Sequence, residues 1–511
     1  MNFILNPGQL KISDFRLLLD EATTLTLHPD CHAAIHASAG MIAKVIEQGK
    51  TVYGINTGFG ALASTRIAIG DLETLQRSIV LSHAAGTGEL LNDKAVRLIL
   101  ALKINSLARG YSGVKMQTID ALITLFNVKI YPCIPSQGSV GASGDLAPLA
   151  HLSATLLGVG NAHYQGKVIS AEEALKIANI SPLHLGPKEG LALLNGTQVS
   201  TALALLGLLA TEEIFISGIT AGALSVDAAR GSDQPFDERI QLVRGHASQI
   251  KVAKILRELL ENSEIRRSHI ECNKVQDPYS LRCQPQVMGA CLNQILFTSE
   301  VLHIESNAVS DNPLVFTEQN EILSGGNFHA EPVALAADAL AVCIAEVAAI
   351  SERRTALLID PHFSHLPAFL VNNPGINSGF MLAQVTAAAL ASENKSLAHP
   401  ASVDSIPTSA NQEDHVSMAT YAARRLLTMT ENAAGIIGIE LLAACQGIDL
   451  LRPLTSSPTL EKIHQLIRKD IDFYDKDRFF APDIEKIKWL IQSGSIRKQI
   501  GLSLFNLEFP G

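Results

Sequence analysis

Apolar residues recur at helical spacing through most of the chain after residue 195. Leu, Ala and Val repeat every three or four positions in residues 199–210, 286–306 and 334–354, which contain few Gly and no Pro. Between Pro407 and Pro453 there is no proline, so up to 45 residues, about 68 Å at 1.5 Å per residue, can form one or two helices. Helices this long and apolar need neighbours along their whole length, which predicts a buried bundle completed by other copies of the chain.

The first third of the chain has a different pattern, in which Gly and Pro separate short helical segments. Such turns place side chains over a scaffold and often carry function. We therefore expect two domains: residues 1–200 as an N-terminal domain with functional loops, and residues 201–511 as a long-helix bundle. Within residues 461–490, 14 of 30 residues are charged, which predicts a solvated C-terminal helical region without a catalytic role. The Gly- and Pro-containing turns are Tyr53-Gly-Ile-Asn-Thr-Gly-Phe-Gly60, His83-Ala-Ala-Gly-Thr-Gly88 and Tyr131-Pro-Cys-Ile-Pro-Ser-Gln-Gly138.

Composition agrees with a helical, soluble protein. Of 511 residues, 47% are apolar and only 5% aromatic, with the single Trp at position 489, which favours an all-α fold over a β-sandwich. The net charge of −10 and the lack of a basic block make nucleic acid and anionic membrane unexpected partners. The most apolar stretch, residues 334–350, contains Asp338 and Glu346 and is shorter than the roughly 20 residues of a membrane span, which predicts a buried bundle helix.

The cysteines indicate a reducing compartment. The chain has an odd number of them, widely scattered and without a CxxC pair, so no disulfide framework is expected. The N-terminus has no basic segment and only a short apolar run, unlike a signal peptide. A cytoplasmic location is therefore the default expectation. The seven cysteines stand at positions 31, 133, 272, 283, 291, 343 and 445.

The densest run of small residues is Gly138-Ser-Val-Gly-Ala-Ser-Gly-Asp-Leu-Ala-Pro-Leu-Ala-His151. One interpretation is a Gly-rich turn before a helix, with Ser143 or Asp145 as its N-cap. The other is chemical: the Gly144 nitrogen can close onto the Ala142 carbonyl while Ser143 loses water. That cyclisation gives a methylidene-imidazolone (MIO) ring, a carbon electrophile that ordinary side chains cannot supply.

This segment resembles the signature of the histidine, phenylalanine and tyrosine ammonia-lyase family, whose prosthetic group is the MIO ring. The resemblance covers nearly the whole chain, and its blocks follow the family order. Five ordered blocks make chance agreement very improbable. The other four blocks are Tyr53-Gly-Ile-Asn-Thr-Gly-Phe-Gly60, Gly190-Leu-Ala-Leu-Leu-Asn-Gly-Thr-Gln198, Gln276-Asp-Pro-Tyr-Ser-Leu-Arg282 and Gly325-Gly-Asn-Phe328.

The resemblance implies a helical fold with an MIO-bearing N-terminal domain, assembled as a homotetramer whose active sites combine residues from different chains. It implies MIO made from Ala142, Ser143 and Gly144, and no external cofactor. Tyr279 then matches the general base that takes the β-proton, and Tyr53 is a second catalytic tyrosine. Arg282 matches the residue that binds the substrate carboxylate, a task suited to its planar fork. The remaining matches are Asn195 and Gln276, which line the ring and the substrate amine, and Phe328, which packs near the ring.

The residues near the substrate ring favour L-histidine, converted to trans-urocanate and ammonia in the first step of histidine degradation. Ser82-His83 and Asn411-Gln-Glu-Asp-His-Val-Ser-Met418 resemble the histidine-specific pattern, and the phenylalanine and tyrosine enzymes lack an equivalent of Glu413. A carboxylate at Glu413 and an imidazole at His83 can bind both nitrogens of a substrate imidazole. The residues alone also allow ordinary roles: a capping or buried histidine at position 83, and a first-turn acid at 413 behind a Ser409-x-x-Gln412 capping box.

Other functions remain open on sequence alone. A tyrosine or phenylalanine ammonia-lyase, or an aminomutase of the same family, is the nearest alternative, and a catalytically silent helical scaffold is a second. His28-Pro-Asp-Cys-His32 and His362-Phe-Ser-His365 offer metal-type ligands, but each lacks the second cluster of a four-ligand site. We therefore expect no bound metal, and surface or capping roles for these histidines.

Overall fold

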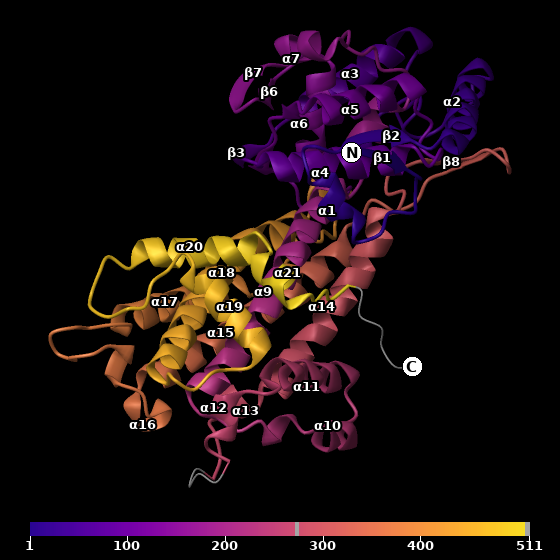
Figure 1. Cartoon of the computed structure of the whole chain (residues 1–511). Helices are drawn as coiled ribbons and strands as arrows, with labels where there is room; N and C mark the ends of the chain where they lie inside the picture. The colour runs from indigo at the N-terminus through magenta and orange to yellow at the C-terminus, as the bar shows by residue number, and fades with distance from the viewer. Residues whose placement is uncertain (271–274, 506–511) are drawn as a thin grey trace. The chain divides into compact units, whose positions relative to one another are not determined.

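The computed structural model describes residues 1–270 and 275–505, which fold mainly as helices joined by short loops (Figure 1). The strands described form only small sheets of two or three strands, which confirms the all-α class. The chain divides into two compact units, each assembled from three segments. Unit 1 contains Met1–Leu206, Ser299–Asp338 and Pro400–Arg424, and unit 2 contains Gly207–Thr298, Ala339–His399 and Arg425–Gly511. The domain boundary at residue 200 stays a prediction.

Unit 1 combines short helices with the small sheets. Its polar loops lie between these elements, as the Gly and Pro pattern predicted. The helices that matter for the site are α3 (Leu72–His83), α4 (Asp93–Leu107), α6 (Leu146–Leu156) and α8 (Glu189–Leu194). The sheets pair β1 (Asn2–Leu5) with β2 (Thr24–Leu27), β3 (Thr87–Leu90) with β5 (Pro135–Gln137), β6 (Asn161–Tyr164) with β4 (Tyr131–Pro132) and β7 (Lys167–Ser170), and β8 (Leu314–Phe316) with β9 (Glu321–Leu323).

Four long helices account for the apolar, helix-spaced stretches. They are α9 (Gln198–Ala228), α14 (Gln284–Ser306), α15 (Glu331–Ile359) and α18 (Ala419–Leu450). The proline-free stretch after Pro407 thus holds one helix of 32 residues, because the residues before it include a run of positive φ angles at Ser409, Ala410 and Asn411. Within unit 2, a Cβ at Gly218 of α9 would contact Val347 of α15 at 3.2 Å and Ile437 of α18 at 3.6 Å. The absence of a side chain at Gly218 lets these three helices pack closely.

These four helices are long and apolar enough to cross a membrane by length and composition. The sequence predicted that the apolar stretch 334–350 is too short to span a membrane. This is wrong about length, since the helix that contains it, α15, runs for 29 residues. In α9 and α18, however, 89% of the most apolar window is buried inside the chain. In unit 2, Arg354 of α15 and Glu440 of α18 form a fully buried ion pair, with Nη2 and Oε2 2.8 Å apart. The apolar residues of α9 and α18 thus form a protein core around a paired charge.

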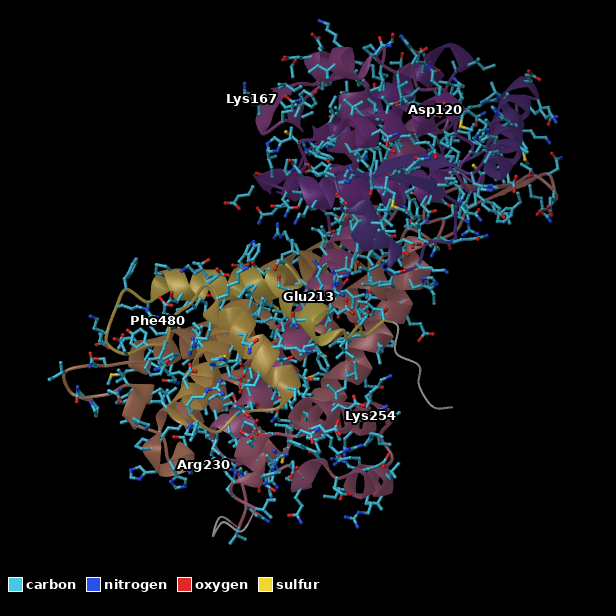
Figure 2. The ribbon with its side chains drawn as sticks, viewed as in Figure 1. Asp120, Lys167, Glu213, Arg230, Lys254 and Phe480 are labelled. Carbon is cyan, nitrogen blue, oxygen red and sulfur yellow. The ribbon has the colours of Figure 1, made fainter. Side chains whose placement is uncertain are left out.

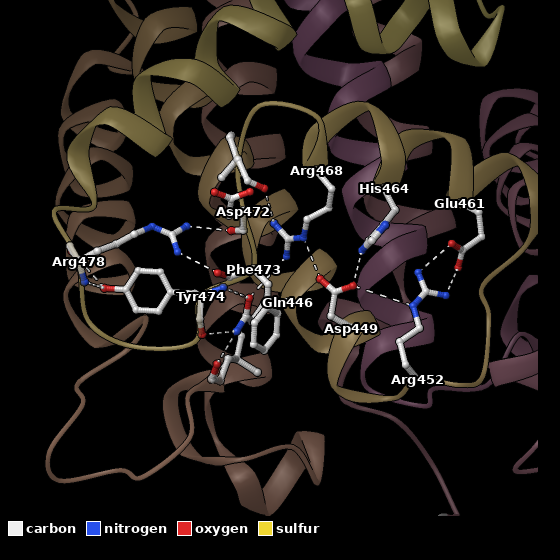
Figure 3. A network of polar contacts seen from close by, with 12 residues as sticks. Gln446, Asp449, Arg452, Glu461, His464, Arg468, Asp472, Phe473, Tyr474 and Arg478 are labelled. Atoms are coloured by element: carbon white, nitrogen blue, oxygen red, sulfur yellow. Dashed lines mark hydrogen bonds and ion pairs between the residues drawn. The ribbon is translucent and has the colours of Figure 1, made fainter.

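The charged C-terminal region is less solvated than the sequence predicted. Asp449, near the end of α18, accepts hydrogen bonds from His464 at 2.7 Å and Arg468 at 2.8 Å, both on α19 (Pro458–Arg468; Figure 3). Their side chains are between 9% and 17% exposed. Burial opposes ionisation of Asp449, but His464 and Arg468 outweigh it and lower the pKa of this carboxyl. The charges therefore join α19 to α18 in addition to facing solvent.

An aromatic cluster fixes the next segment of unit 2. Phe480, labelled in Figure 2, lies with its ring centroid 5.0 Å from that of Phe380 and 5.1 Å from that of Tyr474. Phe480 directly precedes α20 (Ala481–Gln492). The cluster thus positions α20 by ring packing, with the rings in tilted and edge-to-face arrangements.

Candidate active site

One cavity in unit 1 encloses about 1490 Å³ and brings together most of the predicted site residues. Its walls come from segments far apart in the sequence: the turn after residue 50, the end of α3, the loop before α6, the end of α8 and the segment before α18. A predominantly apolar cavity with a few convergent polar groups is the usual form of a small-molecule site. The predicted residues that line it are Tyr53, His83, Ala142, Ser143, Asn195, Phe328 and Glu413.

The Ala142-Ser143-Gly144 loop lies against the segment that follows α8. Gly144 has φ +80° and pairs with Gly196 in a parallel β-bridge. A Cβ at Gly144 would come within 2.4 Å of the Gly196 oxygen, so no other residue fits there without movement. This close approach explains the glycine at position 144, and Gly196 itself has φ +129° with no room for a Cβ beside the Gln198 side chain.

Asp145 fixes the end of this loop. It stands at the N-cap position of α6, as one interpretation of the sequence predicted, but its carboxylate does not cap that helix. The fully buried carboxylate instead accepts hydrogen bonds from the Ser200 nitrogen at 2.7 Å and the Thr420 hydroxyl at 2.6 Å. One carboxylate therefore ties the loop to the start of α9 and the start of α18.

Asn195, the residue that ends α8, holds the serine of the loop. Its Nδ2 donates to the Ser143 carbonyl oxygen at 2.6 Å. Its Oδ1 is buried and has no hydrogen-bond partner among the described residues, which marks a place where a further donor can bind. An MIO ring retains the Ser143 carbonyl oxygen, so the Asn195 hydrogen bond fits the cyclised loop as well as the open one. The backbone bridge between Gly144 and Gly196 also fits the cyclised loop.

Glu413 faces the same serine. The Ser143 hydroxyl donates to its Oε1, and the Thr408 hydroxyl donates to its Oε2 at 2.6 Å. The capping-box interpretation of this region is wrong, because Ser409–Asn411 is a single 3₁₀ turn and the next helix begins only at Ala419. Glu413 is thus an acid in a loop, aimed at the Ala142-Ser143-Gly144 loop.

His83 is the last residue of α3 and lines the cavity near Glu413. Its Nδ1 lies 3.1 Å from the Ser82 hydroxyl. Burial lowers the pKa of His83, although the Ile79 backbone and the charge of Glu413 oppose this effect. The imidazole is therefore held neutral near pH 7, with one nitrogen able to donate and the other to accept.

Tyr53 and Phe328 complete the predicted group in this cavity. The Tyr53 hydroxyl accepts a hydrogen bond from the Gly60 nitrogen at 3.4 Å, within the predicted Gly-rich turn. Among the described residues no acceptor binds its hydroxyl hydrogen, which can therefore serve a ligand. Phe328 contributes an apolar wall in the segment after β9.

Three predicted residues belong to unit 2 and do not line this cavity. Tyr279 and Arg282 form the short helix α13 (Tyr279–Arg282), and the Arg282 guanidinium lies 5.1 Å from the centre of the Tyr279 ring. Their three-residue spacing brings the two side chains into contact, but of these two described residues only Arg282 lines a cavity. Tyr279 is 71% exposed. Gln276 and Arg282 line a separate cavity of about 530 Å³, together with Arg230 (labelled in Figure 2).

Sequence reasoning missed two polar residues next to the loop. Lys103 is fully buried in α4 and donates to the Asn195 main-chain oxygen at 2.7 Å. Thr408 holds Glu413, as described above. The signal for Lys103 was present as one of two cations, with Arg97, in the otherwise apolar run Ala95-Val-Arg-Leu-Ile-Leu-Ala-Leu-Lys103. Thr408 gave no signal, since its role depends on the backbone pairing between Thr408 and Glu413.

One of the metal-type histidines has a capping role. His28 Nδ1 accepts a hydrogen bond from the Asp30 nitrogen at 3.4 Å and so caps a short 3₁₀ helix. In the part of the chain that the structure describes, no group of three or more His, Cys, Asp or Glu is placed to hold a metal ion. The six cysteines at positions 31, 133, 283, 291, 343 and 445 are free thiols, and Cys272 lies outside the described residues.

Comparisons with known proteins agree with this geometry. A histidine ammonia-lyase from Vibrio cholerae is 63% identical over 493 residues, covering 96% of each chain. The crystal structure of histidine ammonia-lyase from Trypanosoma cruzi matches with a TM-score of 0.92 at 40% identity, covering 100% of this chain and 99% of that one. A tyrosine aminomutase from Streptomyces globisporus matches with a TM-score of 0.93 at 32% identity, covering 99% of each. The family model of the aromatic amino acid lyases matches residues 10–469, and the chain therefore belongs to that family.

Proposed function

We propose that this enzyme eliminates ammonia from L-histidine to give trans-urocanate, the first step of histidine degradation. The observation that carries the proposal is the placement of Glu413 and His83 in one cavity with Ser143. A carboxylate and a neutral imidazole complement the two nitrogens of a substrate imidazole, whereas a phenyl ring offers neither of them a partner. The names of the similar histidine ammonia-lyases support the same substrate.

The Ala142-Ser143-Gly144 loop is suited to become the MIO group, which supplies an electrophilic methylidene carbon. In its formation, the Gly144 nitrogen bonds to the Ala142 carbonyl carbon, and two waters leave, one with the Ala142 oxygen and one with the Ser143 hydroxyl. The close Gly144 and Gly196 backbones and the Asn195 hydrogen bond fit this product. An amide donor on the retained Ser143 oxygen withdraws electron density from the ring.

Loss of the Ser143 hydroxyl has a consequence for Glu413. The Glu413 Oε1 accepts its hydrogen bond from the very oxygen that dehydration removes. Since Thr408 still holds Oε2, cyclisation leaves Oε1 fixed in position and free to accept a hydrogen bond. A substrate imidazole N–H can occupy that place.

Tyr279, Gln276 and Arg282 act on the rest of the substrate in this proposal. Arg282 binds the carboxylate through its planar fork, and Gln276 lies near the amine. Tyr279 accepts the β-proton; the electrons of that bond form the double bond, and the amine leaves as ammonia. These residues reach the reaction centre from other copies of the chain in a homotetramer. The apolar helix α14 supports such assembly, since only 39% of its most apolar window is buried within its own chain.

The remaining expectations follow from this activity. The partner is a small amino-acid substrate, with no nucleic acid and no membrane surface. We place the enzyme in the cytoplasm as a soluble protein, in agreement with its free thiols. No external cofactor and no metal enter the reaction.

The substrate is tested by incubating the purified tetramer with L-histidine, L-tyrosine and L-phenylalanine. Ultraviolet absorbance of the unsaturated acids detects elimination, and chromatography of β-amino acids detects an aminomutase. We expect urocanate as the dominant product. Faster turnover of L-tyrosine or L-phenylalanine would reassign the substrate, and a chain at its unmodified mass with all three inactive would indicate a silent scaffold.

The shared site is tested by mixing two inactive variants, Ser143→Ala and Tyr279→Phe, during refolding or co-expression. If one site uses Ser143 of one copy and Tyr279 of another, mixed tetramers contain some sites with both residues intact. We expect part of the wild-type activity to return. Mixed tetramers that form but stay inactive would contradict a site shared between copies.

A further inference from the structure

Lys103 is a buried cation that the proposed reaction does not use. It lies on α4 in an apolar run, is 1% exposed, and does not line the active-site cavity. Its two described hydrogen-bond acceptors are the Asn195 main-chain oxygen at 2.7 Å and Gln198 Oε1 at 3.3 Å, both uncharged. Lys188, the other fully buried lysine in the part of unit 1 that is described, differs because it lies 2.7 Å from the Asp311 carboxylate.

Burial of Lys103 needs a compensating role. Burial and the charge of Lys188 lower the pKa of Lys103 to about 7, although the negative charges of Asp311 and Asp145 oppose that effect. Near pH 7 the side chain is therefore partly ammonium and partly neutral amine, and both forms donate hydrogen bonds. Burying either form in an apolar run costs folding free energy, and a leucine or methionine would fill the same space without that cost. The compensating role is therefore to be sought in the group that the Lys103 side chain binds.

That group is the segment which contacts the catalytic loop. The residue whose main-chain oxygen binds Lys103 is Asn195, and the Asn195 side chain donates to the Ser143 carbonyl oxygen at 2.6 Å. The next residue, Gly196, forms the backbone bridge to Gly144. Gln198, the second acceptor of Lys103, also donates from Nε2 to the Ser310 hydroxyl at 3.0 Å. Lys103 thus binds both ends of the Asn195–Gly196–Thr197–Gln198 turn that supports the loop.

We propose that Lys103 is a positioning residue for catalysis, which fixes this turn so that the Asn195 amide stays on the Ser143 carbonyl oxygen. The proposal rests on the proposed MIO chemistry, because that oxygen carries the charge which develops when the methylidene carbon is attacked. A donor must be held in place beforehand to stabilise such charge, and a small displacement lowers the benefit. Lys103 acts through Asn195 and does not touch the substrate.

The test is a double-mutant cycle of Lys103→Met and Asn195→Ala. Ring formation is measured by intact mass as the loss of two waters, so that kcat is expressed per modified chain. We expect Lys103→Met alone to lower kcat by about ten-fold or more, with KM for the substrate changed by less than about two-fold. In the Asn195→Ala background the same change should have almost no further effect.

Two further variants separate positioning from general destabilisation. Arg97 lies on the same helix, is 1% exposed, and donates to the Leu18 and Thr23 main-chain oxygens, away from the loop. Arg97→Met is the matched control, expected to lower the melting temperature while kcat per modified chain is kept. If Lys103→Met does not assemble, Lys103→Gln, which keeps a donor on a shorter side chain, takes its place in the cycle. Lys103→Arg should restore most of the kcat.

The outcomes are distinct. Additive effects of Lys103→Met and Asn195→Ala on kcat would overturn the proposal, as would an unchanged kcat in Lys103→Met or an equal loss in Arg97→Met. The wild-type enzyme reports separately on the proposed function. If wild type carries the ring but turns over another amino acid, the cycle is run with that substrate, and the role of Lys103 is judged independently.

Discussion

Two polar clusters of this protein differ in how fully their hydrogen-bonding groups are satisfied. In unit 2, Asp449 pairs with His464 and Arg468, and these charges satisfy one another between two helices (Figure 3). In unit 1, Lys103 and Asn195 point their donors at main-chain oxygens, and the Asn195 Oδ1 stays without a described partner. A satisfied cluster stabilises the fold, whereas an incompletely satisfied one beside the Ala142-Ser143-Gly144 loop is available for chemistry.

The largest expected effect in this comparison comes from Ser143→Ala. The variant lacks the hydroxyl that must leave as water, so the ring cannot form and turnover should fall by at least about a thousand-fold. Thermal stability should change little, because the hydrogen bond of the Ser143 hydroxyl to Glu413 is lost in the cyclised wild type as well. Intact mass checks the missing ring, urocanate absorbance the turnover and a melting curve the stability. Wild-type turnover in the variant would remove the ring from the mechanism.

Glu413→Gln should have the next largest effect. The change keeps the shape and removes the charge, and a hydrogen bond to a charged group contributes about 1.5–3 kcal/mol. We expect kcat/KM for L-histidine to fall by about ten- to more than a hundred-fold, with the ring still present by mass. His83→Leu should act in the same direction and improve the relative use of L-phenylalanine. Unchanged histidine kinetics in Glu413→Gln would mean that this carboxylate does not contact the substrate.

In the paired cluster, Asp449→Asn should affect stability and spare activity. We expect a loss of about 1–3 kcal/mol in the free energy of unfolding at pH 7, with kcat within about two-fold of wild type. Because folding lowers the pKa of Asp449, its contribution is complete above the ordinary carboxyl value and disappears as pH falls through the lowered pKa. Denaturant unfolding at pH 7 and pH 3 should therefore show a smaller difference between the two proteins at pH 3. A difference that does not depend on pH would contradict a role for the charge.

Asp227 offers an effect on stability alone, whose dependence on pH has the opposite sign to that of Asp449. Burial raises the pKa of this carboxyl on α9 to about 6, although hydroxyls of Ser456 and Ser263 donate to it. The folded protein therefore binds the proton more tightly, and its stability falls as pH rises from about 4 to about 6. Asp227→Asn cannot ionise, so its stability relative to wild type should be greater by about 3 kcal/mol at pH 8 than at pH 4. Melting curves at the two pH values measure this, and parallel curves would refute it.

The helical bundle could be predicted well from the sequence because its signal is local. Residues 286–306 were predicted as a helix and lie in α14, which begins two residues earlier. The proline-free stretch set an upper limit of 45 residues and left the start of the helix open, since positive φ angles at Ser409, Ala410 and Asn411 have no clear composition signal. The solvation of residues 461–490 was misjudged because the partner of His464 and Arg468, Asp449, lies on another helix.

The candidate site was predictable where the chemistry restricts residue type. Only a loop of small residues can cyclise, and only glycine fits against Gly196 at position 144. The ambiguity at Glu413 could not be resolved from the sequence, because a first-turn acid and a loop acid have the same neighbours in the chain. The structure decides it through the start of α18 at Ala419 and the contacts with Ser143 and Thr408.

The sequence by itself determined the helical class, the cyclisable loop and the residue types of the site, since these depend on composition, spacing and steric limits within short segments. The tertiary structure alone decided which buried charges are paired and which support the loop. Lys103 and Lys188 are both buried, yet Lys188 lies 2.7 Å from the Asp311 carboxylate, whereas Lys103 binds the turn beside Ser143. The physical reason is that the energetic cost and the role of a buried charge depend on the acceptors around it. Those acceptors come from segments about a hundred residues away in the chain.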